Sequence, residues 1–345
     1  MTIAPGDGTK RPTLVDVARL ARVAPSTASR ALKESPRISE ETKGRVRAAA
    51  RGLGYQPNRV AQSLRAMTAP FVGIVVPDIG VTFYSRFVKG AQEVLERSGY
   101  QALVMNTERE AGREDAALRI LEGHRVSGIL LATSSPSSAE PHIPTVYFDS
   151  LAPGRGIASV ARANVEGMEL LVGHLVGHGH RRIGYIGGPP NFTSGTERLA
   201  GFRSAVERHG ADRRQSYVEI ADSVWSATSA AAAMERLLAL AEPPTAIVTS
   251  GDTLALGAMS ACREAGLRLP QDIALVTFDD PEFGSLLDPP VTALRRCDLE
   301  LGRAAATLLL DGLRGATAVS ATETRLPVEL VVRRSCGCTL RSWAA

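Results

Sequence analysis

From residue 71 onward the sequence alternates short apolar runs with longer amphipathic stretches, and this alternation restricts the fold more than any other feature. Two of the amphipathic stretches, 84–98 and 226–241, have helical spacing. Continuous apolar strands separated by helices indicate parallel sheets that are covered on both faces. The strand-like runs are FVGIVVP (71–77), ALVMNT (102–107), GILLATS (128–134), TVYFD (145–149), RIGYIGG (182–188), YVEIAD (217–222), AIVTSGD (246–252) and IALVTFDD (273–280).

Several of these strands end in polar side chains. Ligands of parallel sheets gather at the carboxyl ends of the strands. The sequence therefore predicts a cleft for a small ligand at these ends. The polar residues are Asp78, Asn106, Asp149, Asp252 and Asp279.

The first 70 residues differ from the rest of the chain in charge. They carry 13 Lys and Arg against 5 Asp and Glu, a balance of 13 − 5 = +8, whereas the remaining residues hold 27 basic and 31 acidic groups, a balance of −4. A basic head on a mildly acidic body indicates that the head binds a polyanion.

The head also has helical periodicity. Apolar positions repeat at helical spacing over 14–21, where Thr13 is a suitable N-cap, and a second helix restarts at Pro25 after a three-residue break. A third helical segment opens at Ser39 and is stopped by Gly54. Two short helices joined by a tight turn, followed by a third, predict a helix-turn-helix. Their predicted buried positions are Leu14, Val17, Ala18, Ala21, Ala28, Ala31, Leu32, Val46, Ala49, Ala50 and Leu53.

The second of these helices has the side chains of a major-groove reader. Arg30 can bind a guanine edge with two hydrogen bonds, and Pro25 and Ser26 lie at the helix start, where base edges come closest. Thr27 and Ser29 have the length to reach phosphate oxygens. We therefore expect double-stranded DNA to be the partner of the head.

The segment from Thr13 to Arg65, TLVDVARLARVAPSTASRALKESPRISEETKGRVRAAARGLGYQPNRVAQSLR, resembles without a gap the DNA-binding domain of the LacI/GalR family of bacterial transcription regulators. The resemblance implies that 58–65 is a hinge helix, which folds when two subunits lie side by side on operator DNA. It also implies that Leu64 enters the minor groove as a wedge. These eight residues alone are too few for a stable helix, which agrees with folding on DNA. The implied hinge contacts are Asn58, Arg59, Ala61 and Leu64.

Two residues of the head depart from the family pattern. Arg22 stands in the turn where the family often has Gly, and a positive φ there would cost about 1 kcal/mol. Ala24 replaces the usual Ser cap of the second helix, a loss of about 0.5–2 kcal/mol that Pro25 partly offsets.

The body resembles the periplasmic-binding-protein-like core of the same family over nearly its whole length. Stretches that carry the resemblance include VGIVVPDI, GHGHRRIGYIGG, PTAIVTSGDTLALGAMSACREAGLRLPQDIALVTFDD and PPVTALRR. It implies two Rossmann-like subdomains that are joined by three crossovers and enclose an effector. The implied effector contacts are Phe83, Tyr84, Asp149, Arg198, Trp225, Asp252, Asp279 and Arg296.

The chemistry of these residue types suits a polyol. Carboxylates and guanidinium groups bind hydroxyls, and a Trp face suits the C–H side of a ring. Departures from the family pattern at Ser150, Ala163 and Gly251 mean that the pocket differs from those of the best-known members. A sugar or sugar phosphate is the predicted effector, and a nucleobase-responsive regulator is the alternative.

The expected organisation follows from these segments. It comprises an N-terminal all-α helix-turn-helix DNA-binding domain and an α/β core of the periplasmic-binding-protein type (type I) with two Rossmann-like parallel-sheet subdomains. The expected boundaries are 1–12 for a flexible arm, 13–57 for the DNA-binding domain, 58–68 for the hinge, 69–340 for the core and 341–345 for a tail. Within the core, about 69–164 and 295–326 form the N-subdomain, and about 165–294 and 327–340 form the C-subdomain.

Metal and cofactor chemistry finds weak support in the sequence. His174, His178 and His180 form H-x3-H-x-H without a carboxylate at ligand spacing, and Cys336 and Cys338 form C-x-C without a matching His/Cys pair nearby. GYIGGPP (184–190) is neither a dinucleotide fingerprint nor a P-loop. We therefore expect no metal and no cofactor.

Other functional classes agree less well with the sequence than a transcription regulator does. Asp279 and Asp280 are adjacent on a strand and point to opposite faces, so they do not form a hydrolytic pair, and we expect no enzymatic activity. A solute-binding protein without DNA function is the main alternative, and a nucleoside-hydrolysing or kinase-type α/β enzyme is a more distant one. The opening MTIAPGDGTKRPTL lacks the apolar core of a secretory signal, which predicts a cytoplasmic protein. Without a run of about 18 apolar residues or C-terminal leucine heptads, we expect no membrane span and a homodimer.

Overall fold

The computed structural model describes residues 12–32, 34–55, 69–133, 141–149, 158–189, 192–211, 216–220, 225–315 and 322–338. The chain divides into two compact units at the boundary between Ala69 and Pro70. The predicted hinge contacts Asn58, Arg59, Ala61 and Leu64 lie outside the described residues, as do the predicted hinge 58–68, the tail 341–345 and nearly all of the predicted arm 1–12.

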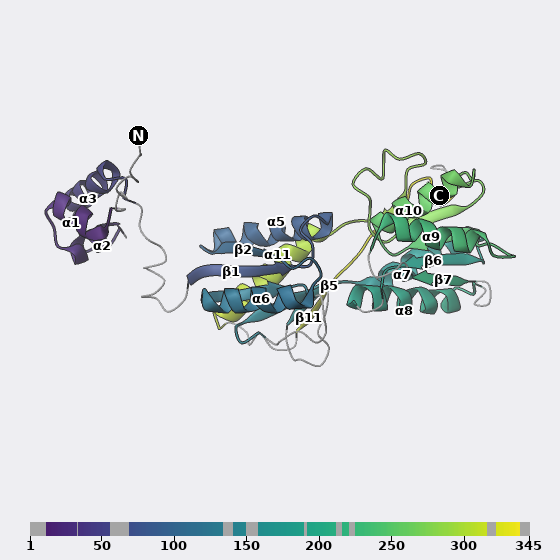
Figure 1. Ribbon diagram of the computed structural model, residues 1–345, viewed down its shortest axis with the longest axis horizontal. Helices are drawn as coiled ribbons and strands as arrows, with labels where there is room; N and C mark the ends of the chain where they lie inside the picture. The colour runs from purple at the N-terminus through teal and green to yellow at the C-terminus, as the bar shows by residue number, and fades with distance from the viewer. Residues whose placement is uncertain are drawn as a thin grey trace, which may run out of the picture. The chain divides into compact units, whose positions relative to one another are not determined.

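The N-terminal unit is a three-helix domain (Figure 1) with the predicted helices α1 (Leu14–Ala21) and α2 (Pro25–Leu32), followed by α3 (Glu40–Gly52). The Thr13 hydroxyl accepts a hydrogen bond from the Asp16 N–H (3.3 Å), and the Asp16 carboxylate accepts one from the Thr13 N–H (3.0 Å). This reciprocal capping box fixes the start of α1. A core of small and branched side chains lets the helices cross closely, and it consists of Val17, Ala18, Ala21, Ala28, Ala31, Val46, Ala49 and Ala50.

Arg22 lies in the turn between α1 and α2, at the position where the family often has Gly. The backbone conformation of this residue decides whether its side chain causes strain. Arg22 is left-handed, with φ 56° and ψ 47°, and its N–H donates to the carbonyl oxygens of Ala18 and Arg19. A residue with a Cβ is strained in this region by about 1 kcal/mol. The arginine is therefore accommodated at a modest cost, and the turn keeps its shape.

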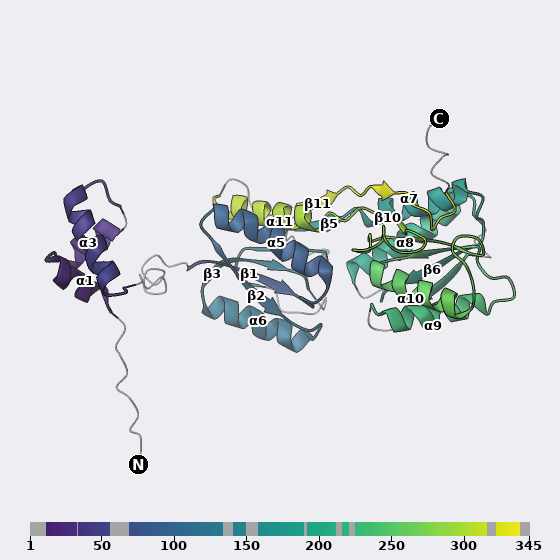
Figure 2. The same ribbon diagram turned by 90° about the horizontal axis from the view of Figure 1, so that it is seen from above.

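The N-subdomain of the core is a six-stranded sheet of order β11-β5-β4-β3-β1-β2. Helices α5 (Thr82–Arg97) and α11 (Asp298–Leu313) cover one face, and α6 (Ala111–Gly123) covers the other (Figure 2). Alternate residues of β1 face these two layers, Ile74 with α5 and α11 and Val75 with α6. The strands are β1 (Ala69–Val76), β2 (Gln101–Asn106), β3 (Val126–Leu131), β4 (Thr145–Phe148), β5 (Ser159–Arg162) and β11 (Glu323–Leu326).

The C-subdomain repeats this plan with a sheet of order β12-β10-β9-β8-β6-β7. Helices α7 (Asn164–Gly177) and α8 (Thr193–Arg208) pack on one face, and α9 (Ala227–Leu238) and α10 (Asp252–Glu264) on the other. The short β12 pairs antiparallel with β10 and is the exception in a sheet whose other recorded pairs are parallel. The strands are β6 (Ile183–Gly187), β7 (Tyr217–Ile220), β8 (Ala246–Thr249), β9 (Ala274–Thr277), β10 (Thr292–Leu294) and β12 (Leu330–Val331).

The chain crosses between the subdomains three times, after β5, after β10 and after β11. The predicted fold class, a helix-turn-helix domain with a core of two parallel-sheet α/β subdomains, is confirmed. Among the described residues, no helix is both long and apolar enough to span a bilayer.

Candidate functional site

The DNA-reading residues predicted on the second helix lie on the side of α2 away from the core of the head. Pro25, Ser26 and Arg30 are exposed, and Thr27 and Ser29 are half-buried beside them. Ala28 and Ala31 face inward and are fully buried, because the helix repeat places them on the opposite stripe. The structure thus presents one continuous polar face with a cationic end.

Two basic residues of α3, Lys43 and Arg47, form ion pairs within the domain. The Lys43 ammonium lies 2.7 Å from a Glu40 oxygen, and the Arg47 guanidinium binds Glu34 with two hydrogen bonds (3.0 and 2.5 Å). Side chains held by carboxylates are poorly placed to neutralise a phosphate. The exposed Arg30 on α2 is therefore the stronger candidate for base contact.

The core has a cavity, partly open to solvent, that is lined by both subdomains and the crossovers. All eight residues proposed from the sequence as effector contacts line it. The full lining is Val81, Phe83, Tyr84, Arg109, Thr133, Asp149, Arg162, Phe192, Ser194, Arg198, Trp225, Gly251, Asp252, Thr253, Asp279 and Arg296.

A buried network of opposite charges forms one wall of the cavity. Arg162 binds Asp279 and also lies 3.5 Å from Asp149, while Arg198 reaches the second oxygen of Asp279 at 3.4 Å. Burial alone would raise the pKa of Asp279, but Arg162 and Arg198 outweigh it and lower the pKa to about 2. Asp279 is therefore ionised at neutral pH and holds the two arginines in place.

Arg198 retains hydrogen-bonding capacity inside this network. Its Nε donates to Asn164 (2.9 Å) and its Nη1 to the Ser250 carbonyl oxygen (2.5 Å). Its Nη2 is buried and has no hydrogen-bond partner in the described part of the protein. Because a buried donor without a partner is costly, a polar ligand in the cavity would relieve that cost.

A second ion-pair cluster ties the crossover after β10 to both subdomains. Arg296 donates to Asp252 at the start of α10 and to Asp298 at the start of α11, both at 2.7 Å. Burial alone would lower the pKa of Arg296, but Asp279, Asp298 and Asp252 raise it above its ordinary value. The guanidinium is thus a fixed positive charge that bridges the two halves of the cavity.

Aromatic rings complete the lining. The Phe83 and Tyr84 rings meet edge to face at 4.9 Å, and the Arg162 guanidinium lies over Phe83 at 4.5 Å. The Tyr84 hydroxyl donates to Asp149 at 3.4 Å. Burial and the Asp149 charge raise the pKa of Tyr84, so its hydroxyl stays protonated.

Glycines make room for the Trp225 indole. A Cβ at Gly188 would lie 2.1 Å from the indole, and one at Gly251 would lie 3.1 Å from it. A side chain at Gly188 would therefore displace the ring. Gly251, which departs from the family pattern, allows the indole to lie close to the start of α10.

Sequence reasoning missed several lining residues, and Arg162 is the most consequential of them. It lies at the carboxyl end of β5, so the rule that polar strand ends mark the site would have found it if the four-residue strand had been predicted. Asp78 and Asn106 are also polar strand ends, but they were not among the proposed effector contacts and do not line the cavity. Their carboxylate and amide oxygens accept hydrogen bonds from the Gly80 and Ile79 N–H groups and shape the loop after β1.

Asp280 lies beyond the end of β9, as Asp279 does, but it has a different partner. It binds Arg333 with two hydrogen bonds of 2.6 Å, away from its neighbour Asp279. The prediction that these adjacent carboxylates do not form a pair is confirmed.

A helix-turn-helix head and a two-subdomain α/β core that encloses a charged cavity define a class of transcription regulators. The N-terminal segment 13–58 matches the family of bacterial regulatory proteins of the lacI type, and residues 172–336 match the periplasmic binding protein-like domain. The chain belongs to the LacI family of bacterial regulatory proteins.

Individual relatives are similar to this chain over nearly its whole length. The transcriptional repressor CytR of Escherichia coli K12 is 31% identical over 94% of this chain and 96% of its own. The ribose operon repressor of the same strain is 34% identical over 86% of this chain and 92% of its own. A crystal structure of the Lac repressor dimer bound to operator and the anti-inducer ONPF has a TM-score of 0.85, with 29% identity over 95% of this chain and 99% of that one.

The protein is thus a transcriptional repressor of the LacI family with its own DNA-binding domain, and not an enzyme. The match over 13–58 excludes the alternative of a solute-binding protein without a DNA-binding domain.

Proposed function

We propose that the protein acts as a homodimer on a pseudo-palindromic operator and that a small polar effector in the core cavity adjusts its affinity for DNA. The observation that carries this proposal is the joint presence of an exposed reading face on α2 and a cavity with a partnerless buried donor. The Lac repressor, which shares the fold, is a dimer on its operator in the crystal. Because operators lie on the chromosome, we place the protein with the nucleoid in the cytoplasm.

Each subunit reads one half-site with α2. Arg30 binds a guanine edge, Pro25 and Ser26 pack against base edges at the helix start, and Thr27 and Ser29 bind phosphates. The family resemblance adds contacts from Asn58, Arg59 and Ala61, and a wedge from Leu64 that opens the central base step.

The effector is a sugar or sugar phosphate in this proposal. Asp149, Asp252 and Asp279 supply acceptors for hydroxyl protons, and the free Nη2 of Arg198 supplies a donor for a hydroxyl oxygen. The Trp225 face suits the C–H side of a pyranose or furanose ring. The other sides of the proposed effector site are formed by Phe83, Tyr84 and Arg296. A nucleobase is the second candidate effector. The transcriptional repressors CytR of Escherichia coli K12 and PurR of Haemophilus influenzae are also relatives of this chain.

Effector binding acts through the subdomains. A ligand that contacts residues of both halves favours the arrangement in which these contacts are best, and that arrangement sets the spacing of the two heads. A coupling free energy of about 1–3 kcal/mol is enough to change operator affinity usefully.

A thermal-shift screen of the full chain against pentoses, hexoses, their phosphates and nucleobases tests the effector assignment. We expect a sugar to raise the Tm of the wild type and to leave the Tm of Trp225→Ala unchanged. This variant should still bind the operator. The matched control Phe283→Ala changes an exposed aromatic residue outside the cavity lining and should respond as the wild type does. A response limited to nucleobases, or one that Trp225→Ala retains in full, would contradict the sugar assignment.

A further inference from the structure

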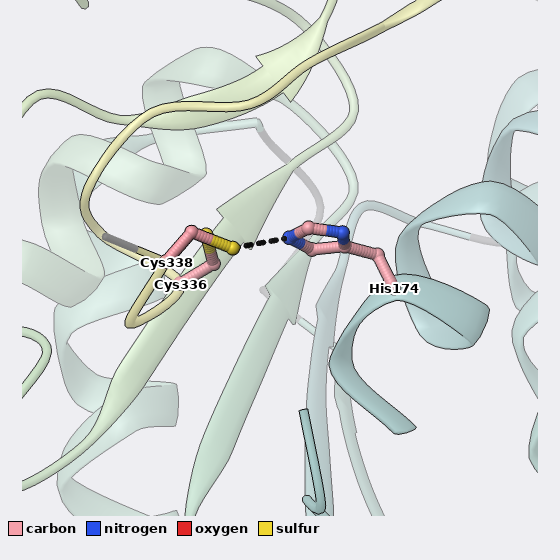
Figure 3. A group of neighbouring side chains, drawn as sticks. All are labelled: His174, Cys336 and Cys338. Carbon is pink, nitrogen blue, oxygen red and sulfur yellow. Dashed lines mark hydrogen bonds between the residues drawn. The ribbon is translucent and has the colours of Figure 1, made fainter. Parts of the chain in front are cut away.

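A second cluster of reactive side chains lies where the segment after β12 packs against the end of α7. His174, Cys336 and Cys338 place one nitrogen and two sulfur atoms within 4.8 Å of one another (Figure 3). The Cys338 Sγ lies 3.4 Å from the His174 Nε2 and 2.9 Å from the Nε2 of His178. None of these residues lines the effector cavity.

Local structure brings the four side chains together. His174 and His178 are four residues apart at the end of α7, so their rings lie on one side of the helix, with centroids 4.7 Å apart. Gly337 lies between the cysteines with φ 89°, a left-handed conformation that glycine adopts easily, in a turn closed by its N–H and the Arg334 carbonyl. Figure 3 shows both cysteines directed toward His174.

The turn that carries the cysteines is anchored independently of them. The buried Ser335 hydroxyl donates to the Leu275 carbonyl oxygen (2.6 Å) and accepts from the Thr292 N–H (2.9 Å). These bonds fix the segment to β9 and β10, so the cysteines are held in place before any ligand arrives. Their exposed fractions are 0% for Cys336 and 6% for Cys338, whereas His178 is exposed.

Two thiols and two imidazoles are the donor set of a structural zinc site. Zn²⁺ binds sulfur at about 2.3 Å and histidine nitrogen at about 2.0–2.1 Å in a tetrahedron, which separates donor atoms by roughly 3.3–3.8 Å. The donor atoms of His174, Cys336 and Cys338 lie within 4.8 Å of one another, and the His178 Nε2 lies 2.9 Å from the Cys338 Sγ, so side-chain rotations would close the set on an ion. Free cysteine pairs in a protein of the cytoplasm favour metal binding over a disulfide framework.

We propose that His174, Cys336 and Cys338 bind a tetrahedral Zn²⁺ ion, with His178 as the fourth ligand. The ion displaces the thiol protons, forms two Zn–S and two Zn–N bonds, and ties the C-terminal segment to α7. From the sequence we expected neither the H-x3-H-x-H motif nor the C-x-C motif to bind a metal by itself. The present proposal combines residues of both motifs in one site. His174 and Cys338 are 164 residues apart, and only the return of the chain through β12 brings the motifs together.

Metal titration of the full chain tests the site. The protein is kept reduced, stripped with a chelator and titrated with Co²⁺, which reports thiolate ligation by a charge-transfer band and tetrahedral geometry by intense d–d bands. We expect one Co²⁺ per chain and its displacement by Zn²⁺. Cys338→Ala and His174→Gln should weaken binding by at least about 100-fold, and His178→Gln by at least about 10-fold.

Matched variants separate ligation from general damage. Cys262→Ala removes a buried cysteine from the core beside α9 and α10 and should bind Co²⁺ as the wild type does. Zn²⁺ should raise Tm in the wild type and in Cys262→Ala but not in Cys338→Ala; Cys336→Ser repeats the test if Cys338→Ala fails to fold. A wild type without a thiolate band, or equal binding by Cys338→Ala and Cys262→Ala, would overturn the proposal.

Discussion

At the scale of single residues, Asp279 is the centre of the cavity. Its carboxylate forms ion pairs with the Arg162 and Arg198 guanidinium groups, both of which are buried. Removing one partner of a buried ion pair leaves an uncompensated charge, which costs about 3–5 kcal/mol. The residue therefore has a structural role in addition to the proposed effector contact.

Asp279→Asn should lower the free energy of unfolding of the core by about 3–5 kcal/mol, measured by urea denaturation of the full chain. Asp272→Asn is the matched control, because it breaks the exposed pair with Arg268 and should cost less than about 1 kcal/mol. Equal effects of the two substitutions would remove the special role of Asp279.

The same carboxylate predicts a dependence on pH. Its pKa falls from 3.8 to about 2 on folding, so its stabilising effect is complete above about pH 4 and is lost as the pH falls toward 2. The stability difference between wild type and Asp279→Asn should therefore shrink over that interval in acid denaturation series. A difference that stays constant from pH 5 to pH 2.5 would contradict the lowered pKa.

At the scale of elements, the head was the most predictable part. Helices 14–21 and 25–32 have the bounds that apolar spacing, Thr13 and Pro25 predicted. The strands β5, β10, β11 and β12 were not predicted, since two to four residues carry too little periodicity to be detected. Because β5 was not predicted, Arg162 at its carboxyl end was not predicted as a site residue either.

The turn of the helix-turn-helix gives a test at this scale. Arg22→Gly should stabilise α1 and α2 by about 0.5–1 kcal/mol, because it relieves a left-handed residue of its Cβ. Hydrogen exchange of the helix amides in the full chain measures the change. Arg19→Gly, inside α1, is the opposite control and should destabilise by about 1 kcal/mol; stabilisation by both would refute the strain argument.

The proposed hinge gives a second test. Leu64→Ala should weaken specific operator binding on the order of 10- to 100-fold, because the wedge between base steps is lost. Binding to random DNA rests on phosphate charge and should be unchanged. Gln62→Ala is the control, because it changes a residue of the same segment that is not among the proposed DNA contacts. Equal losses on operator and random DNA would count against a wedge.

At the scale of the whole molecule, the alternation of strands and helices predicted the two sheets, and the family resemblance predicted which residues surround the cavity. Periodicity alone does not distinguish Asp78 and Asn106 from the strand ends that line the cavity, because it identifies strand ends without showing which loops turn toward the second subdomain. The cluster of His174 with Cys336 and Cys338 was beyond sequence reasoning for a related cause. The two parts of this cluster are brought together by the order of the strands in the sheet, and a local sequence pattern does not show that order.

The central claim is that binding of a ligand in the core changes the affinity of the same chain for operator DNA. Fluorescence anisotropy of a labelled fragment from its own promoter region, titrated with the full chain at fixed salt with and without the sugar selected by thermal shift, measures that coupling directly. We predict salt-dependent, sequence-specific binding whose Kd changes about 5- to 150-fold when the sugar is added. Binding that is equal for promoter and random fragments, or a Kd that the ligand leaves unchanged, would contradict the account.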